Sequence, residues 1–297
     1  MTMPNFLGVG FFRCGTSWLH DLLDSHPQCY VPQAFKEIHY FTPQHIGRGR
    51  PWYESFFPED PTPYRAIGEI GPGYCRGDCI DRIAAEPGLG ESGRFLFMIR
   101  NPVDRYFSGY RQQARTEPRP LPIEEARDIG ALTPEQLAFA PAIRRWRDRF
   151  GPDRVLVTLL EHVQSDPVSA RERVAAFLGL DPKLFPPEAG ATAANRSVPP
   201  KHRRAYKLAA GANVWLVRHG LHHVSGALRR MGLRRLFGFG AGKDTVPPMR
   251  PETRRRLGEL IEPDVRELEA MLGLDLNVWR RRNGLIPEEA SSPAIAT

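Results

Sequence analysis

The chain has 297 residues, 41% of them hydrophobic, which is enough for the core of one large α/β domain or two small ones. Lysine and arginine number 41 against 34 acidic residues, and the net charge of +7 favours an anionic ligand, an anionic substrate or a membrane surface as partner. No run of about 18 apolar residues occurs, and the N-terminus lacks the pattern of a signal peptide, so we expect neither a spanning helix nor secretion.

Residues 5–23 predict a strand, a glycine-bearing loop and a helix. An apolar run covers residues 6–9, and an i, i+3, i+4 apolar stripe begins at Leu19. Between them lie glycines, the cation Arg13 and the hydroxyls of Thr16 and Ser17. Backbone N–H groups and the positive end of a helix dipole converge in such a loop, which favours an anion.

This loop departs from the phosphate loop of nucleotidases, because Thr16 follows Gly15 where those enzymes need lysine. The basic residue, Arg13, precedes Gly15 by two positions. The shifted pattern resembles the 5′-phosphosulfate loop of sulfotransferases that use 3′-phosphoadenosine 5′-phosphosulfate (PAPS). The resemblance implies donor-binding roles for Arg13, Gly15, Thr16, Ser17 and Trp18. On the loop alone, an ordinary glycine-bearing turn explains the pattern about equally well.

Residues 36–41 read KEIHYF. Alone they are compatible with a strand edge that carries a surface ion pair. Their position about twenty residues after the loop makes them similar to the KE-x-H-F-F segment of heparan-sulfate and related carbohydrate sulfotransferases. That resemblance implies that Glu37 is the general base toward the acceptor and that His39 lies beside it. A positioned carboxylate suits this chemistry, since an attacking hydroxyl or amine must lose a proton.

Residues 66–74 predict a short strand that leads into a glycine- and proline-containing turn. The carbohydrate sulfotransferases often carry E-K-(T/S)-P-x-Y here, and the lysine contributes to their active site. This chain has Ile70 at the matching position. The departure leaves Arg13 as the expected cation on the transferred group.

Residues 94–99 predict a buried strand that ends at Arg100. Asn101 is a favoured N-cap and Pro102 a favoured first helical residue, so a helix should follow. Arg100 would project from the end of the strand, with Ser108 two turns into the helix. The spacing resembles the R-x(7)-S motif that binds the 3′-phosphate of PAPS in sulfotransferases.

Further strands and helices complete the prediction. Residues 154–160 predict a third buried strand, and Asp166 caps a helix that runs to Gly179. Residues 141–150 predict a basic amphipathic helix. Three strands, each followed by a helix, indicate a parallel sheet whose ligands lie beyond the carboxyl ends of its strands. A last helical region contains Pro263, as a kink or a break.

Two later stretches have open interpretations. The segment around Asn195 and Lys201 loosely resembles one that closes over the nucleotide in bacterial sulfotransferases. Residues 208–237 carry a 4-3-4-3 apolar stripe flanked by arginines. Such a helix lies on an anionic membrane, packs on the domain or covers the acceptor cleft.

The sequence therefore predicts one α/β, P-loop-like domain over residues 1–297, with a parallel sheet flanked by helices. Its core covers residues 5–180. A basic helical insertion follows at about 200–245, and C-terminal helices cover residues 250–282. We expect a PAPS-dependent sulfotransferase that yields 3′-phosphoadenosine 5′-phosphate (PAP) and needs no metal. The acceptor would be a carbohydrate, lipid-linked or natural-product molecule and would attack in line. The expected catalytic residues are Glu37, Arg13 and His39, and the donor-binding residues are Arg13, Gly15, Thr16, Ser17, Trp18, Arg100 and Ser108.

Two alternatives stay open at this stage. A P-loop kinase or nucleotide-binding enzyme would share the loop but would need lysine after Gly15. A basic membrane- or nucleic-acid-binding module would share the charge, yet no nucleic-acid motif is present, so we expect no nucleic-acid partner. Four scattered cysteines give neither a disulfide framework nor a zinc site, which favours a cytoplasmic location, with peripheral membrane contact through residues 208–237.

Overall fold

A computed structural model describes residues 2–33, 35–114, 117, 119–191 and 246–287. The segment around Asn195 and Lys201, the expected insertion at about 200–245 and the amphipathic stripe at 208–237 lie outside these residues. Within the described residues, no helix is long and apolar enough to cross a membrane.

A five-stranded sheet forms the centre of the molecule, in the order β2-β3-β1-β4-β5, and every neighbouring pair is parallel. The strands are β1 (Phe6–Gly8), β2 (Cys29–Tyr30), β3 (Ala66–Ile70), β4 (Arg94–Ile99) and β5 (Val155–Leu159). The predicted α/β fold is confirmed. The two-residue β2 was not predicted, because so short a pairing leaves no periodic pattern to read.

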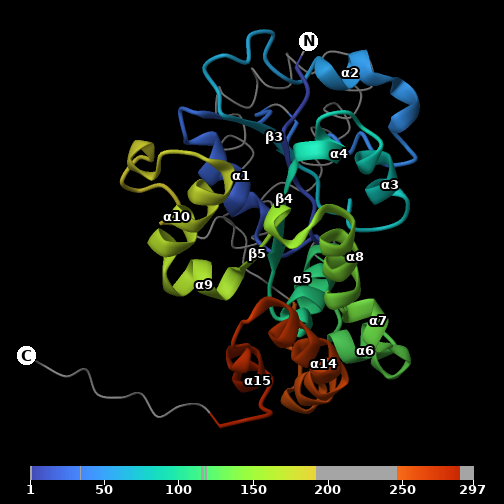
Figure 1. The fold of residues 1–297 in the computed structure, drawn as a ribbon. Coiled ribbons are helices and arrows are strands. Elements are labelled where there is room, and N and C mark those ends of the chain that lie inside the picture. The colour runs from blue at the N-terminus through green and yellow to red at the C-terminus, as the bar shows by residue number, and fades with distance from the viewer. Residues whose placement is uncertain (1, 34, 115–116, 118, 192–245, 288–297) are drawn as a thin grey trace, which may run out of the picture.

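Helices cover the sheet on both sides, and a further helical layer lies below it in the view of Figure 1. The described helices of the first part are α1 (Thr16–Asp24), α2 (Arg50–Glu54), α3 (Cys79–Ala84), α4 (Leu89–Ser92), α5 (Pro102–Ala114) and α6 (Ile123–Ala126). Those of the second part are α7 (Pro134–Leu137), α8 (Ala140–Phe150), α9 (Leu160–Ser165), α10 (Pro167–Leu178), α14 (Pro251–Leu272) and α15 (Asn277–Arg282).

Two of the predicted helix starts are stabilised by their caps. The Asn101 side chain accepts a hydrogen bond from the Val103 amide at 2.9 Å, which begins α5. The Asp166 carboxylate accepts from the Ser169 amide at 3.0 Å, which begins α10. Pro263 lies inside α14, which continues past it to Leu272, so of the two predicted alternatives, a kink or a break, the break is excluded.

The end of β4 is tied to the C-terminal helices. Asn101 is fully buried, and its amide donates to Asn283 Oδ1 at 3.0 Å and to the Trp279 carbonyl at 3.4 Å. Trp279 itself is fully buried. The C-terminal helices therefore fix the turn that follows Arg100, although 178 residues separate Asn101 from Trp279.

Candidate functional site

The loop between β1 and α1 approaches β4 closely and then turns into the helix. A Cβ at Gly10 would lie 3.1 Å from the Met98 amide nitrogen, so the backbone passes where a side chain would crowd it. Gly15, the N-cap of α1, has φ 92° and no side-chain cap. The helix thus presents first-turn N–H groups without a capping side chain, an arrangement that suits an anion.

Arg13 lies at the centre of this loop in the left-handed conformation, with φ 67°, which non-glycine residues adopt only rarely. Its Nε donates to Ser108 Oγ on α5 at 3.0 Å, across 95 residues of sequence. Its carbonyl accepts from Arg100 Nη1 at 3.4 Å. The two motifs that the sequence assigned to opposite ends of one donor are therefore adjacent in space.

Arg100 retains an unused donor. Its Nη2 is 4.0 Å from the Asp104 carboxylate, and its Nε is buried without a hydrogen-bond partner among the described residues. A buried N–H with no partner is costly, and an anion at this position would satisfy it.

Lys36 reaches the loop from the KEIHYF segment. Its Nζ donates to Thr16 Oγ1 at 3.1 Å and to Ser17 Oγ at 3.3 Å, and lies 3.4 Å from Glu37 Oε1. Burial lowers the pKa of Lys36, and the Glu37 charge opposes that shift. Lys36 was given no role from the sequence, although it directly precedes Glu37. The sequence also has Ile70 where carbohydrate sulfotransferases often have an active-site lysine, so that position supplies no lysine. Ile70 is fully buried in the core.

Glu37 and His39 form a pair near the loop. The Glu37 side chain is 36% exposed, and its Oε2 lies 3.9 Å from His39 Nε2. Burial lowers the pKa of His39, so the imidazole is neutral at neutral pH, while the nearby Glu37 charge opposes the shift. Within the described part of the chain, His39 Nε2 has no hydrogen-bond partner. The pair offers an accessible carboxylate beside a neutral ring.

Glu69 on β3 lies beneath this pair and was missed by sequence reasoning. The side chain is fully buried, and Oε2 accepts from the backbone amides of Ile38 at 2.9 Å and His39 at 3.3 Å. Oε1 accepts from the hydroxyls of Tyr53 at 2.8 Å and Tyr74 at 2.6 Å. Burial raises the pKa of Glu69 to about 7, although all four donors favour the ionised form. A charged residue inside a predicted buried strand was the available signal.

The stability that wild-type Glu69 confers over a Glu69→Gln variant is expected to fall between pH 5 and pH 8. The carboxyl titrates near 4.5 when unfolded and near 7 when folded, so the folded chain binds more protons between these values. Its contribution is complete below 4.5 and is lost as pH rises through 7, a change on the order of 3 kcal/mol. Thermal unfolding of both proteins across this range measures it. A difference in melting temperature that does not vary with pH would contradict the prediction.

Trp18, a predicted donor-binding residue, has its side chain in the core. Its side chain is 2% exposed, and its indole N–H donates to the Gly190 carbonyl at 3.0 Å. The ring is a core residue that joins α1 to the segment after α10, so it offers no open face to a ligand here.

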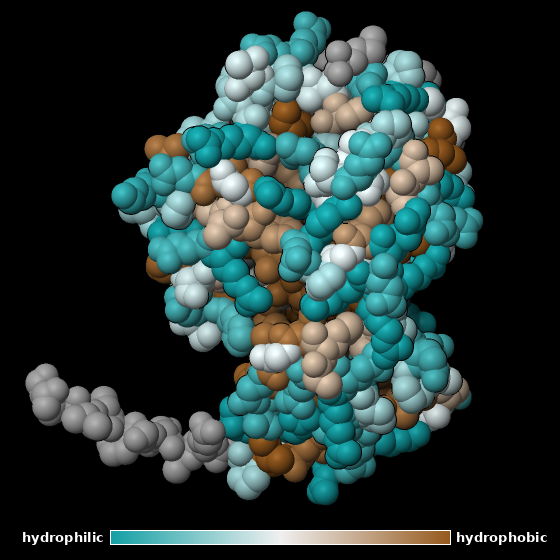
Figure 2. All heavy atoms as spheres, viewed as in Figure 1, coloured by the Kyte–Doolittle hydropathy of each residue, from teal (hydrophilic) through white to brown (hydrophobic). Residues whose placement is uncertain are grey.

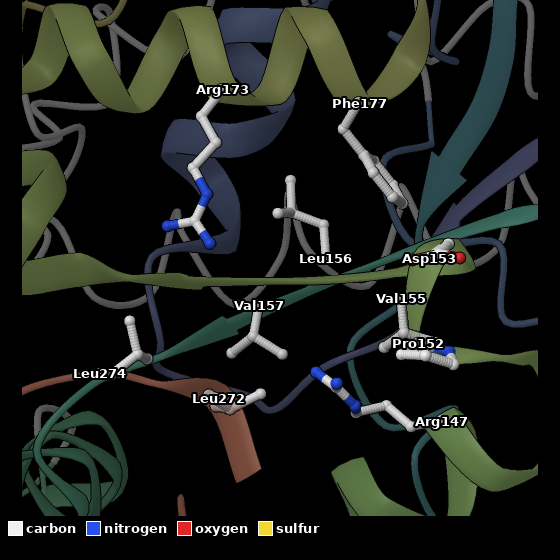
Figure 3. A pocket seen from close by; sticks show the side chains of 10 residues that line it. All are labelled: Arg147, Pro152, Asp153, Val155, Leu156, Val157, Arg173, Phe177, Leu272 and Leu274. Carbon is white, nitrogen blue, oxygen red and sulfur yellow. The ribbon is translucent and has the colours of Figure 1, made fainter. Parts of the chain in front are cut away.

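A cavity of about 220 Å³ lies elsewhere, along β5. Figure 3 shows Arg147 and Arg173 on either side of an apolar floor that includes Val157. Figure 2 shows hydrophobic side chains gathered in a hollow on this face of the molecule. The residues that line the cavity include none of those around Arg13, so it is separate from the candidate site.

Among the described residues, no group of three or more His, Cys, Asp or Glu side chains could hold a metal.

Comparison with known proteins identifies sulfotransferases as relatives, although no family model matches the chain. The chain is 26% identical over 204 residues to the human bifunctional heparan sulfate N-deacetylase/N-sulfotransferase 2, covering 61% of this chain and 22% of that protein. The mouse enzyme 3 of the same description is 26% identical over 199 residues, covering 61% and 23%. This chain thus corresponds to less than a quarter of the length of these relatives.

A solved structure agrees in both fold and sequence. The crystal structure of a sulfotransferase from Alicyclobacillus acidocaldarius superimposes with a TM-score of 0.63 at 27% identity, covering 95% of this chain and all of that one. The resemblance to sulfotransferases that the motifs predicted is confirmed by these comparisons.

Proposed function

We propose that this chain, which is similar to sulfotransferases in sequence and in fold, transfers a sulfuryl group from PAPS to a hydroxyl or amine of an acceptor. One observation carries the proposal. Arg13 contacts both Ser108 and Arg100, so the two predicted donor-binding motifs, from distant parts of the chain, lie together in one basic site. A donor with charged groups at both its 5′ and 3′ positions needs such a pair of motifs.

The donor-binding residues follow from charge and position. Arg13, Gly15, Thr16 and Ser17 would hold the 5′-phosphosulfate, together with Lys36, which already contacts both hydroxyls. Arg100 and Ser108 would hold the 3′-phosphate, and Arg100 Nε, which no described residue engages, supplies a donor for it. The residues present therefore fit the donor, which supplies the sulfuryl group when bound.

The chemistry assigned to the chain is proton acceptance and charge neutralisation. Glu37 would accept the proton of the attacking hydroxyl or amine, in an arrangement in line with the departing phosphate. Arg13 and Lys36 would stabilise the negative charge that develops on that phosphate. His39, held neutral by burial, would orient the Glu37 carboxylate or the acceptor.

The acceptor is proposed as a class. The named relatives act on heparan sulfate, so a glycan is one candidate, and a lipid-linked or natural-product hydroxyl is another. A cytoplasmic location and membrane contact through residues 208–237 stay predictions.

Calorimetry with PAP and with adenosine 5′-phosphate tests the donor site. The wild-type chain should bind PAP at least about 10-fold more tightly, because charge-assisted hydrogen bonds to the 3′-phosphate are strong. Arg100→Ala should remove that preference. Arg94→Ala, at the opposite end of β4, should preserve it.

Transfer itself is then measured with radiolabelled PAPS and a panel of glycan and small-molecule acceptors. Label on any acceptor supports the proposal. Equal affinity for PAP and adenosine 5′-phosphate, together with magnesium-dependent ATP turnover, would instead indicate a kinase or nucleotidase.

A further inference from the structure

We propose that Glu69 is a positioning residue that fixes the backbone between Glu37 and His39, and thereby sets where the Glu37 carboxylate stands. The inference rests on the proposed function, in which Glu37 acts on the acceptor. It concerns a group on β3 that touches neither donor nor acceptor.

The segment that carries Glu37 has no regular secondary structure of its own. Residues 35–39 form neither helix nor strand. Its backbone is therefore not fixed by a hydrogen-bonded ladder. His39 is also left-handed, with φ 57°, a conformation that persists only where the surroundings determine it.

The Glu69 carboxylate supplies the missing anchor. One of its oxygens accepts from two consecutive amides, those of Ile38 and His39. The other oxygen is held by the hydroxyls of Tyr53 on α2 and Tyr74 in the turn after β3. All four donors are satisfied inside the core, so the carboxylate cannot rotate without leaving a buried polar group unpaired.

The Glu69 carboxylate holds the backbone directly beside Glu37. Glu37 directly precedes Ile38, and His39 is itself one of the two amide donors. Lys36 fastens the same segment to the loop on its other side, through Thr16 and Ser17. β3 pairs with β1 and β2, so the anchor itself stands on a rigid element. Loss of the anchor would shift Glu37 relative to the loop.

Two substitutions at Glu69 separate positioning from charge. Glu69→Met keeps the length of the side chain but can accept no hydrogen bond, and turnover should fall about 100-fold, as expected for a misplacement near 1 Å. Glu69→Gln keeps one acceptor oxygen for the two amides, and should retain turnover within about 5-fold. PAP affinity should change less than about 3-fold in both, because Arg13, Arg100 and Ser108 lie on other elements and Lys36 keeps its own contacts with Thr16 and Ser17.

Hydrogen–deuterium exchange provides a readout that needs no activity. Peptides covering residues 36–41 should exchange faster in Glu69→Met than in the wild type, and Glu69→Gln should restore protection. If Glu69→Met does not fold, Tyr74→Phe replaces it. That variant removes the 2.6 Å hydrogen bond, and should speed exchange in the same peptides and lower turnover with PAP affinity unchanged.

A carboxylate outside the site serves as the control. Asp166 accepts from the backbone amide of Ser169 at 3.0 Å, at the start of α10. Asp166→Ala should speed exchange around residues 167–170 but leave turnover within about 2-fold, because Asp166 contacts none of the site residues.

The outcomes are distinguishable. Faster exchange at residues 36–41 with reduced turnover and intact PAP binding, rescued by Gln, supports the positioning role. Unchanged exchange or unchanged turnover in Glu69→Met overturns it, as does an equal loss of turnover in Asp166→Ala. A wild-type chain that transfers no sulfuryl group would overturn the proposed function, and the exchange data would still report whether Glu69 anchors the segment.

Discussion

A Glu37→Gln variant is expected to lose turnover by about 10³-fold, the range observed for removal of a general base. Glutamine has nearly the same shape but cannot accept the acceptor's proton. PAP affinity should be retained, because the loop residues and Arg100 are unchanged. Single-turnover transfer of label from PAPS, with calorimetric binding of PAP, measures both quantities.

Glu59→Gln is the matched control, since Glu59 is an exposed carboxylate outside the site. It should have wild-type turnover. Retained turnover in Glu37→Gln would show that another group accepts the proton, and a large loss of PAP affinity would show that Glu37 shapes the donor site instead.

A Lys36→Met variant is expected to lose turnover by about 10²- to 10³-fold, as when one stabilising donor is removed from a developing anion. The Lys36 ammonium contacts both loop hydroxyls and lies 3.4 Å from the Glu37 carboxylate, so it is placed where the transferred group and the base would meet. Methionine preserves the apolar stem and removes the charge. Steady-state transfer at saturating PAPS gives the loss in kcat.

Lys183→Met is the control, because Lys183 is exposed in the turn after α10. Lys36→Arg tests geometry, since guanidinium and ammonium differ in shape and hydrogen bonding, and it should restore only part of the rate. Wild-type kcat in Lys36→Met would leave Arg13 as the cation on which charge neutralisation depends.

Much of the fold was readable locally. The β4 strand at residues 94–99 and the Asn101 cap of α5 were both predicted, because each depends on an apolar run or on hydrogen bonds between near neighbours. The partners of the strands were not readable. The order β2-β3-β1-β4-β5 depends on which edges meet in space.

Some residues of the candidate site could likewise be predicted from local sequence, and others could not. Arg13 and Arg100 could be proposed from the sequence, since each belongs to a short motif at the end of a strand. Lys36 was overlooked because its contact with Thr16 spans 20 residues and depends on how an irregular segment folds back. The burial of the Trp18 ring was not predicted, because burial is a property of the packed chain.

The sequence by itself determined the glycine-bearing loop after β1, the arginine motif after β4 and the strands that carry them, because a handful of neighbouring residues specifies each. Only the tertiary structure decided that Arg13 meets Arg100 and Ser108, and that Glu69 holds the segment between Glu37 and His39. The physical reason is that buried hydrogen bonds form between groups that chain folding brings together, and their strength depends on the loss of water around them.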